Sequence, residues 1–287
     1  MVGRIIRILA WLLVWTSMGH LWFKRASLQQ FHAAHKHDYV LLGDSHADDV
    51  RWEGRPRFSG PAQDLFSSLK RVETLVQTHS DSSALKGVVL TFWPNKFSPL
   101  AERRMSGGPL DDNWVGMALG SVAPLWGWRD AMREDLPWRF RVQIMWHMLQ
   151  FKTTLSFWDS ACESKSVDAT YEYGLTEEMK TQDWWSQAAI GPAMMEELID
   201  QVISQGWTLV LVENPLHPTY YRQVNPQALQ GYEEDLALWT AHPQVHALRL
   251  GRQNLDHTWF RDYHHLTCEG ERAVGDSLDA FLRALDW

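Results

Sequence analysis

The chain has 287 residues, a formal net charge of -8 and a hydrophobic content of 45%. This hydrophobic content is sufficient for the core of an enzyme-sized domain. The negative net charge excludes the basic footprint that binding to a nucleic-acid backbone requires, so no nucleic-acid partner is expected.

The first 24 residues predict a membrane anchor or a signal peptide. Residues 5–23 are mostly apolar and aromatic, and a helix of this length is about long enough to cross a bilayer. We favour an uncleaved anchor over residues 1–24, because aromatic residues continue past a loose cleavage-like sequence at 17–19. Arg4 and Arg7 precede the uninterrupted apolar run that begins at Ile8, and they favour export of everything that follows the segment.

Residues 25–38 are polar, and we interpret them as a linker between the anchor and the domain. Helical spacing would bring His32 and His35 to one face, which leaves a metal site open as an alternative. An exposed linker explains these residues as well, and we expect no metal.

A strand pattern begins at Tyr39 and stops at Gly43-Asp44-Ser45. The serine therefore follows the carboxyl end of a predicted buried strand, where open α/β sheets place their chemistry. A hydroxyl is a weak nucleophile until a base removes its proton and a third group orients that base. Ser45 is a candidate nucleophile, and the sequence must supply its two partners elsewhere.

The next segments continue an alternation of strands and helices. The pattern predicts a short strand and turn over 57–62, a helix over 64–76 and a buried strand over 87–92. Asn95 follows that strand. From 96 to 190 the strand pattern lapses, and we predict a largely helical insertion that serves as a lid, a substrate wall or a docking surface.

The insertion contains many of the 17 tryptophans of the chain. Tryptophan suits membrane interfaces and binding surfaces, although a large core also uses it. The clustering of tryptophans favours an interaction surface in the middle of the chain.

Strand and helix patterns return after the insertion. The expected elements are a helix over 192–203, a strand over 207–212, a helix over 233–240, a strand over 245–250 and a final helix over 273–285. Asn214 and His217 follow the strand that ends at 212, so they are possible substrate contacts, with loop structure as the alternative.

An acid and a histidine lie three residues apart near the end of the chain, at Asp262 and His265. We expect His265 to act as the base and Asp262 to orient it. The tripeptide of Ser45 recurs at 275–277, but within the predicted final helix, which argues against a second nucleophile. The two cysteines, Cys162 and Cys268, show no paired spacing and leave the redox compartment undecided.

The blocks around Ser45 and around Asp262 and His265 resemble the SGNH (GDSL-type) hydrolase superfamily. The resemblance implies a three-layer α/β/α, flavodoxin-like fold over residues 39–287, a catalytic triad and no cofactor. It also implies an oxyanion hole formed by Ser45, Gly60 and Asn95. A glycine that usually accompanies the superfamily's asparagine is absent before Asn95, so a turn-forming role is an equal alternative for that residue.

One span followed by such a domain is similar to proteins that work beside membrane-bound O-acyltransferases in bacterial envelopes. This resemblance implies a bacterial inner-membrane protein whose domain faces the periplasm. Its expected function is the transfer or removal of acyl groups, acetyl above all, on an envelope or exported polysaccharide. Two alternatives stay open: an exported general carboxylesterase or lipase, and a non-catalytic subunit of an acylation complex.

Overall fold

Five short apolar segments form one parallel sheet in the order β2-β1-β3-β4-β5. The computed structural model describes residues 24–59, 65–105, 136–143, 176–251, 255–262 and 264–285, together with the single positions 11, 18 and 21. The strands are β1 (Tyr39–Leu42), β2 (Arg57–Phe58), β3 (Gly87–Thr91), β4 (Thr208–Glu213) and β5 (Val245–Arg249). All five overlap segments that the sequence predicts as strands, and the α/β class is confirmed.

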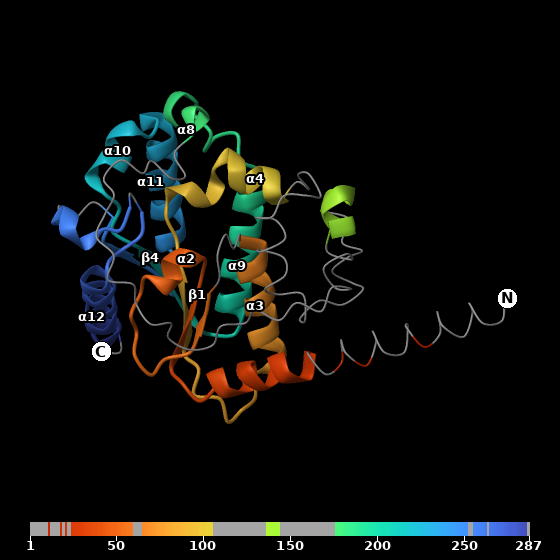
Figure 1. Ribbon diagram of the computed structural model, residues 1–287. Helices are drawn as coiled ribbons and strands as arrows, with labels where there is room; N and C mark the ends of the chain where they lie inside the picture. Colours follow the sequence, from red (N-terminus) through yellow and green to blue (C-terminus); the bar gives the residue numbers. More distant parts are fainter. Residues whose placement is uncertain are drawn as a thin grey trace, which may run out of the picture.

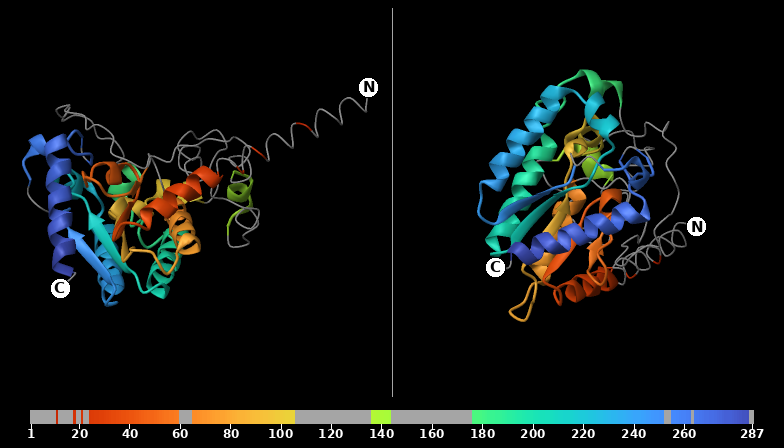
Figure 2. Two further views of the ribbon diagram at one scale, coloured as in Figure 1. Left: turned by 90° about the horizontal axis from the view of Figure 1, so that it is seen from below. Right: turned by 90° about the vertical axis from the view of Figure 1, so that its left-hand side faces the viewer.

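Helices cover both faces of this sheet, which gives three layers (Figure 1). The long helices are α3 (Leu65–Thr78), α9 (Ile190–Ser204), α11 (Pro226–Thr240) and α12 (Cys268–Leu285). The shorter ones are α2 (Ser45–Asp48), η1 (Pro94–Phe97), α4 (Pro99–Met105), α8 (Glu177–Thr181), α10 (Pro218–Gln223) and η3 (His257–Trp259). The helix α12 lies on one side of the sheet, and α3 and α9 lie side by side on the other (Figures 1 and 2).

Strand alternation divides the core into two apolar clusters. Leu41, Val89 and Val210 are paired across β1, β3 and β4, and they pack with Leu278 of α12. The neighbouring strand residues turn to the opposite face, as successive side chains of a strand must. There Val88 belongs to the cluster that includes α3, α9 and α11. Burial of both faces explains why the strands read as continuous apolar runs.

The segment predicted as a linker is instead part of the folded domain. Residues 24–34 are helical, and Phe31 is fully buried. Its ring stacks on Phe58 of β2, with 4.3 Å between the ring centroids. The helix is amphipathic, because Phe31 and Ala34 are fully buried and Ala33 packs against the same apolar cluster.

His35 is buried, and hydrogen bonds occupy both nitrogens of its ring. Nδ1 lies 2.8 Å from Ser83 Oγ, and Nε2 lies 3.1 Å from the carbonyl oxygen of Leu75. His32 is exposed. These contacts explain His35 as a core residue without a metal.

Much of the predicted insertion lies outside the described residues, as do five of the six tryptophans that cluster between 114 and 158. Among its described residues, η1, α4, residues 138–143 and α8 are helical, as expected, whereas residues 182–189 form turns and irregular structure. Trp138 is 65% exposed, whereas Phe140 is buried and its ring packs edge-on against Phe66 of α3. This short helical stretch therefore anchors on the domain and presents a tryptophan outward.

In the part of the chain that the structure describes, no helix has both the length and the apolar character needed to cross a membrane. The predicted anchor, residues 1–24, lies almost entirely outside that part.

The strand order places a topological switch point between β1 and β3. The chain passes from β1 to β2 on one side and then crosses to β3 on the other. Open parallel sheets bind ligands in the crevice outside the carboxyl ends of their strands at such a point. Ser45 follows β1 and Lys96 follows β3, so both lie at this edge.

Candidate active site

A tight turn presents Ser45 at the end of β1. Gly43 has a φ of 154°, and a Cβ at this position would collide with Thr91 Oγ1, so the turn requires glycine. Asp44 then caps α2, because its Oδ1 accepts the backbone N–H of His46 at 3.0 Å. Ser45 is the first residue of α2 and is half-buried.

The structure brings Ser45, His265 and Asp262 together although 220 positions separate Ser45 from His265. His265 Nε2 lies 2.9 Å from Ser45 Oγ, and His265 Nδ1 lies 2.8 Å from Asp262 Oδ2. The other carboxylate oxygen, Asp262 Oδ1, accepts the backbone N–H groups of His264 at 2.9 Å and of His265 at 2.8 Å. The three sequence candidates therefore form a continuous hydrogen-bonded relay.

The relay is electrostatically coupled. Although burial opposes its ionisation, the hydrogen bond to His265 and the nearby imidazoles hold the pKa of Asp262 well below its usual range. Burial also disfavours the charged form of His265, but the hydrogen bond to Asp262 and the nearby Asp49 raise its pKa above its usual value. The histidine is therefore a stronger base than a free imidazole, and Asp262 remains ionised to orient it.

A buried ion pair stabilises the turn that carries Ser45. Lys96 Nζ, in η1 after β3, lies 2.8 Å from Asp44 Oδ2, and both side chains are nearly inaccessible. Burial alone would raise the pKa of Asp44, yet Lys96 and the backbone N–H of His46 hold it well below its usual range. The pair therefore joins the segment after β1, immediately before Ser45, to the segment after β3.

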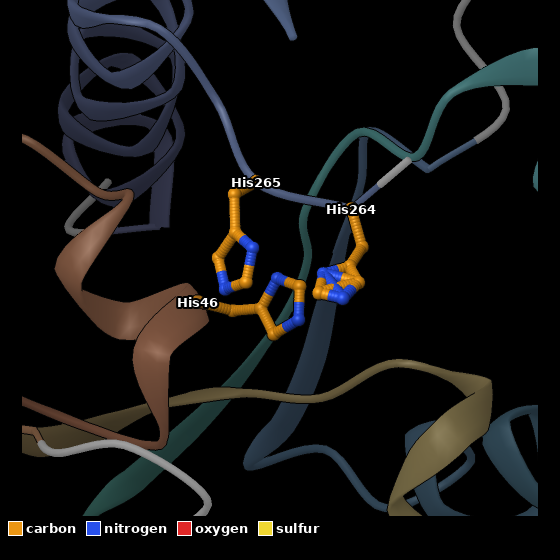
Figure 3. Close-up of side chains that lie close together, drawn as sticks. All are labelled: His46, His264 and His265. Atoms are coloured by element: carbon orange, nitrogen blue, oxygen red, sulfur yellow. The ribbon is translucent and has the colours of Figure 1, made fainter. Parts of the chain in front are cut away.

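Two further histidines surround His265 (Figure 3). His46 of α2 lies parallel to the His265 ring, with 5.2 Å between centroids and 8° between planes. His264 meets His265 nearly edge-on at 4.1 Å, and Trp93 covers His46 at 4.2 Å. Figure 3 shows the three imidazoles turned toward one another, one from α2 and two from the loop before α12.

Both additional histidines are uncharged at neutral pH. Burial, followed by the proximity of the other imidazoles, lowers the pKa of His46 well below its usual value. Burial and the neighbouring His265 lower the pKa of His264 to about 3. His46 Nδ1 is buried and has no hydrogen-bond partner among the described residues.

A second carboxylate lies behind His265. Asp49 is fully buried, and its Oδ1 lies 3.1 Å from Arg261 Nη2. Burial raises the pKa of Asp49 to about 8, although His265 and Arg261 oppose the shift. This contact joins α2 to the loop that carries Asp262 and His265.

The predicted oxyanion residues are only partly described. Ser45 is the first residue of α2, and the backbone N–H groups of the first turn of a helix have no partner within that helix. Asn95 lies in η1 at the same edge of the sheet, and its Oδ1 is buried without a hydrogen-bond partner among the described residues. Gly60 lies outside the described residues.

Asn214 and His217 have structural roles in this arrangement. Asn214 Nδ2 donates to the carbonyl oxygen of His46 at 2.7 Å, and this bond holds α2 against the end of β4. His217 caps α10, accepting the backbone N–H of Thr219 at 3.3 Å, and its ring packs against Phe260. The loop-structure alternative is therefore supported for both residues.

Two sequence features near the C-terminus are resolved by the structure. Cys268, the first residue of α12, is disulfide-bonded. The sequence has one other cysteine, Cys162, so an intramolecular disulfide requires it as the partner. Ser277, of the second Gly-Asp-Ser, lies within α12 and donates to the carbonyl oxygen of Ala273 at 2.7 Å, as a helical residue does.

Sequence reasoning did not identify Lys96, Asp49, Arg261 or His46 as parts of the site. Their positions carry a weak signal: three of the four follow Ser45 or precede Asp262 within four residues, and Lys96 directly follows Asn95. Only the folded arrangement pairs them.

The fold and the site define an α/β protein with a serine, histidine and aspartate relay at the carboxyl edge of its sheet. No model of a known family matches the sequence, and no curated protein matches it significantly.

Proposed function

We propose that this chain is an SGNH-type serine esterase or O-acyltransferase with a flavodoxin-like domain. Its substrates would be acyl esters, acetyl above all, of a cell-envelope or exported polysaccharide. The observation that carries the proposal is the relay of Ser45, His265 and Asp262, whose two hydrogen bonds measure 2.9 and 2.8 Å. Three residues of the required types in this order and at bonding distance are what nucleophilic acyl transfer needs.

In the first step, His265 Nε2 takes the proton of Ser45 Oγ while that oxygen attacks the ester carbonyl carbon. Asp262 holds the imidazole through Nδ1 and stabilises the imidazolium that forms. The tetrahedral intermediate then collapses, and the leaving alcohol receives the proton from Nε2. An acyl group remains on Ser45.

The negative charge that develops on the carbonyl oxygen requires donors that are already in place. The backbone N–H of Ser45 is the first candidate, and Gly60 and Asn95 are the others. Loss of a single donor of this kind typically slows such reactions by about 10²–10³-fold.

In the second step, His265 removes a proton from the acceptor, which attacks the acyl-enzyme and releases Ser45. Water as the acceptor gives hydrolysis, and a sugar hydroxyl gives transfer. The same residues serve both outcomes, so the acceptor decides between an esterase and a transferase.

The disulfide at Cys268 supports an extracytoplasmic site of action. Disulfides persist in oxidising compartments such as the bacterial periplasm and are rare in the cytosol. This agrees with the proposed N-terminal anchor, which would hold the domain at the outer face of the inner membrane beside a membrane-bound O-acyltransferase.

A fluorophosphonate probe tests the proposal, because it reacts with activated serines. We expect wild-type protein to be labelled and Ser45→Ala to lose the label. Ser277→Ala is a matched control, since it alters the same tripeptide but only a bond within α12. Equal labelling of wild type and Ser45→Ala would exclude Ser45 as the nucleophile.

The acceptor is tested separately with an aryl acetate and acetyl-free polysaccharide. Acetate found on the polysaccharide identifies a transferase, and acetate found only in solution identifies an esterase. Release of the aryl alcohol in both cases must disappear in Ser45→Ala.

A further inference from the structure

Three imidazoles from two distant parts of the chain converge beside the relay. One ring nitrogen from each of His46, His264 and His265 lies within 4.8 Å of the others, and the first two residues are buried. Among the described residues, this is the group of histidine, cysteine and acidic side chains whose ligand atoms lie close enough together to share a metal ion. The relay uses only His265, so the chemistry leaves His46 and His264 without a role.

The surroundings resemble those of ligating histidines in metal sites. Metal-bound imidazoles usually donate their second ring N–H to a carboxylate, which fixes the tautomer and the ring orientation. Asp262 Oδ2 lies 2.8 Å from His265 Nδ1, and Asp262 Oδ1 lies 3.4 Å from His264 Nδ1. One carboxylate therefore hydrogen-bonds to one of the three rings and lies close to a second.

His46 adds an independent observation. Its Nδ1 is buried and lacks a hydrogen-bond partner among the described residues, and the nearest carboxylate oxygen, Asp49 Oδ2, is 3.9 Å away. A buried polar atom without a partner is costly, and a ligand is one way to satisfy it.

From these contacts we infer that His46, His264 and His265 form an inhibitory site for a divalent transition metal, with Zn²⁺ as the expected ion. Imidazole ligands favour Zn²⁺ and related ions over Mg²⁺ and Ca²⁺, which prefer oxygen. Three protein ligands leave one position for water, as in open zinc sites.

The geometry requires a small adjustment. Tetrahedral zinc with bonds of about 2.0–2.1 Å places neighbouring nitrogens about 3.3 Å apart. The ligating nitrogens of the three histidines, which lie within 4.8 Å of one another, must therefore approach one another by up to about 1.5 Å when the metal binds.

Metal binding should inhibit the reaction because both ring nitrogens of His265 already take part in the relay. Its Nε2 contacts Ser45 Oγ and its Nδ1 contacts Asp262 Oδ2, so a metal on either nitrogen replaces one bond of the relay. A metal-bound imidazole also has no lone pair to accept the serine proton. Inhibition thus rests on the proposed function, whereas metal binding does not.

Binding is measured in the Ser45→Ala background, where no catalytic turnover intervenes. Titration with Co²⁺, which replaces Zn²⁺ in such sites and has visible d–d bands, should give the spectrum of a four- or five-coordinate ion. His264→Ala in the same background should weaken Co²⁺ binding at least tenfold, because even the loss of an outer-shell partner typically costs about 10–100-fold. His264→Asn guards against a packing defect, and unfolding midpoints establish that each variant is folded.

His79→Ala is the matched control. This exposed histidine lies beside the buried His35, with 5.6 Å between ring centroids. Its loss should leave the Co²⁺ spectrum unchanged. Equal Co²⁺ affinity with and without His264, or loss of the spectrum in His79→Ala, would overturn the site.

The link to activity is tested with the wild-type protein and the fluorophosphonate probe. Stoichiometric Zn²⁺ should slow labelling at least tenfold, EDTA should restore it, and Mg²⁺ should have no effect. Undiminished labelling in protein that has bound Zn²⁺ overturns the inhibitory role. Absence of labelling even with EDTA contradicts the proposed function, and the Co²⁺ titration still decides the metal site.

Discussion

Asp49 and Arg261 form a contact of 3.1 Å between Oδ1 and Nη2 that joins the two halves of the site. Asp49 follows the helix that begins with Ser45, and Arg261 directly precedes Asp262. Only 1% of the Asp49 side chain is exposed, so its carboxylate depends on this partner. The distance between nucleophile and base is therefore held by groups outside the relay itself.

The buried Asp49 should make stability depend on pH. Its pKa rises to about 8 in the folded protein, whereas an unfolded aspartate titrates near its usual value of about 4. Between these values the folded state binds more protons, so stability falls as the pH rises from about 4 to about 8, by up to about 1.4 kcal/mol per pH unit. Asp49→Asn removes this contribution, and chemical denaturation at several pH values measures the difference.

The stability of Asp49→Asn relative to wild type should increase from pH 4 to pH 8. Asp81→Asn, which replaces an exposed aspartate, should stay within about 0.5 kcal/mol of wild type at every pH. A constant difference between Asp49→Asn and wild type across the range would contradict the assignment.

Removal of the orienting carboxylate should lower both the rate of probe labelling and the pKa of His265. Asp262→Asn keeps an oxygen for the backbone N–H groups but removes the charge that raises the pKa of His265. We expect the rate of probe labelling to fall by about 10³–10⁴-fold, as when the triad aspartate of a serine protease is replaced. Labelling kinetics as a function of pH measure both effects.

His265 must be neutral to accept a proton, so wild-type labelling should decline as the pH falls through a pKa above the usual value of 6.5. In Asp262→Asn this decline should move to lower pH. Asp256→Asn, on the same loop and exposed, is the control and should retain the wild-type profile.

Loss of Lys96 should destabilise the turn that carries Ser45. Lys96→Met leaves Asp44 buried and unpaired, and breaking a buried pair in this way typically costs about 3–5 kcal/mol. The pair of Lys180 with Glu177 is a matched surface case, because 82% of the Glu177 side chain is exposed. Lys180→Met should cost no more than about 1 kcal/mol, and comparable losses in the two variants would refute the role of the buried pair.

Gly43 should tolerate no side chain. Gly43→Ala introduces both an unfavourable φ and a collision with Thr91, whereas Gly54→Ala introduces only the unfavourable φ of 70°. The strain alone costs about 1–2 kcal/mol, and the collision should add about 1–3 kcal/mol. Thermal unfolding compares the stability of the two variants. Equal losses of stability would show that the turn can adjust to accommodate a Cβ at position 43.

The sheet and the relay were predictable because their signals are local. The three central strands, β1, β3 and β4, are short apolar runs, and the strand before Ser45 ends at a glycine whose role the structure explains. Asp262 and His265 lie three residues apart, so one loop carries both. A serine after the first strand and a base after the last then share the carboxyl edge of a parallel sheet.

The ion pairs around the relay could not be predicted from local sequence signals. Lys96 and Asp44 come from the ends of two strands, and nothing in the sequence specifies that they meet rather than face solvent. The helix over 24–34 was missed for a related reason, since His32 and the other polar residues outweigh Phe31 and Ala34 in the pattern. Burial of a polar side chain depends on distant neighbours, which a single sequence does not reveal.

The nucleophile follows the first strand of the sheet, and its base lies only three residues before α12. During synthesis on the ribosome, Ser45 emerges long before His265 and has no base until the final helix is about to be made. A truncated or incompletely translated chain would carry an unreactive hydroxyl. The serine can therefore become reactive only after the segment that carries His265 has been made and folded.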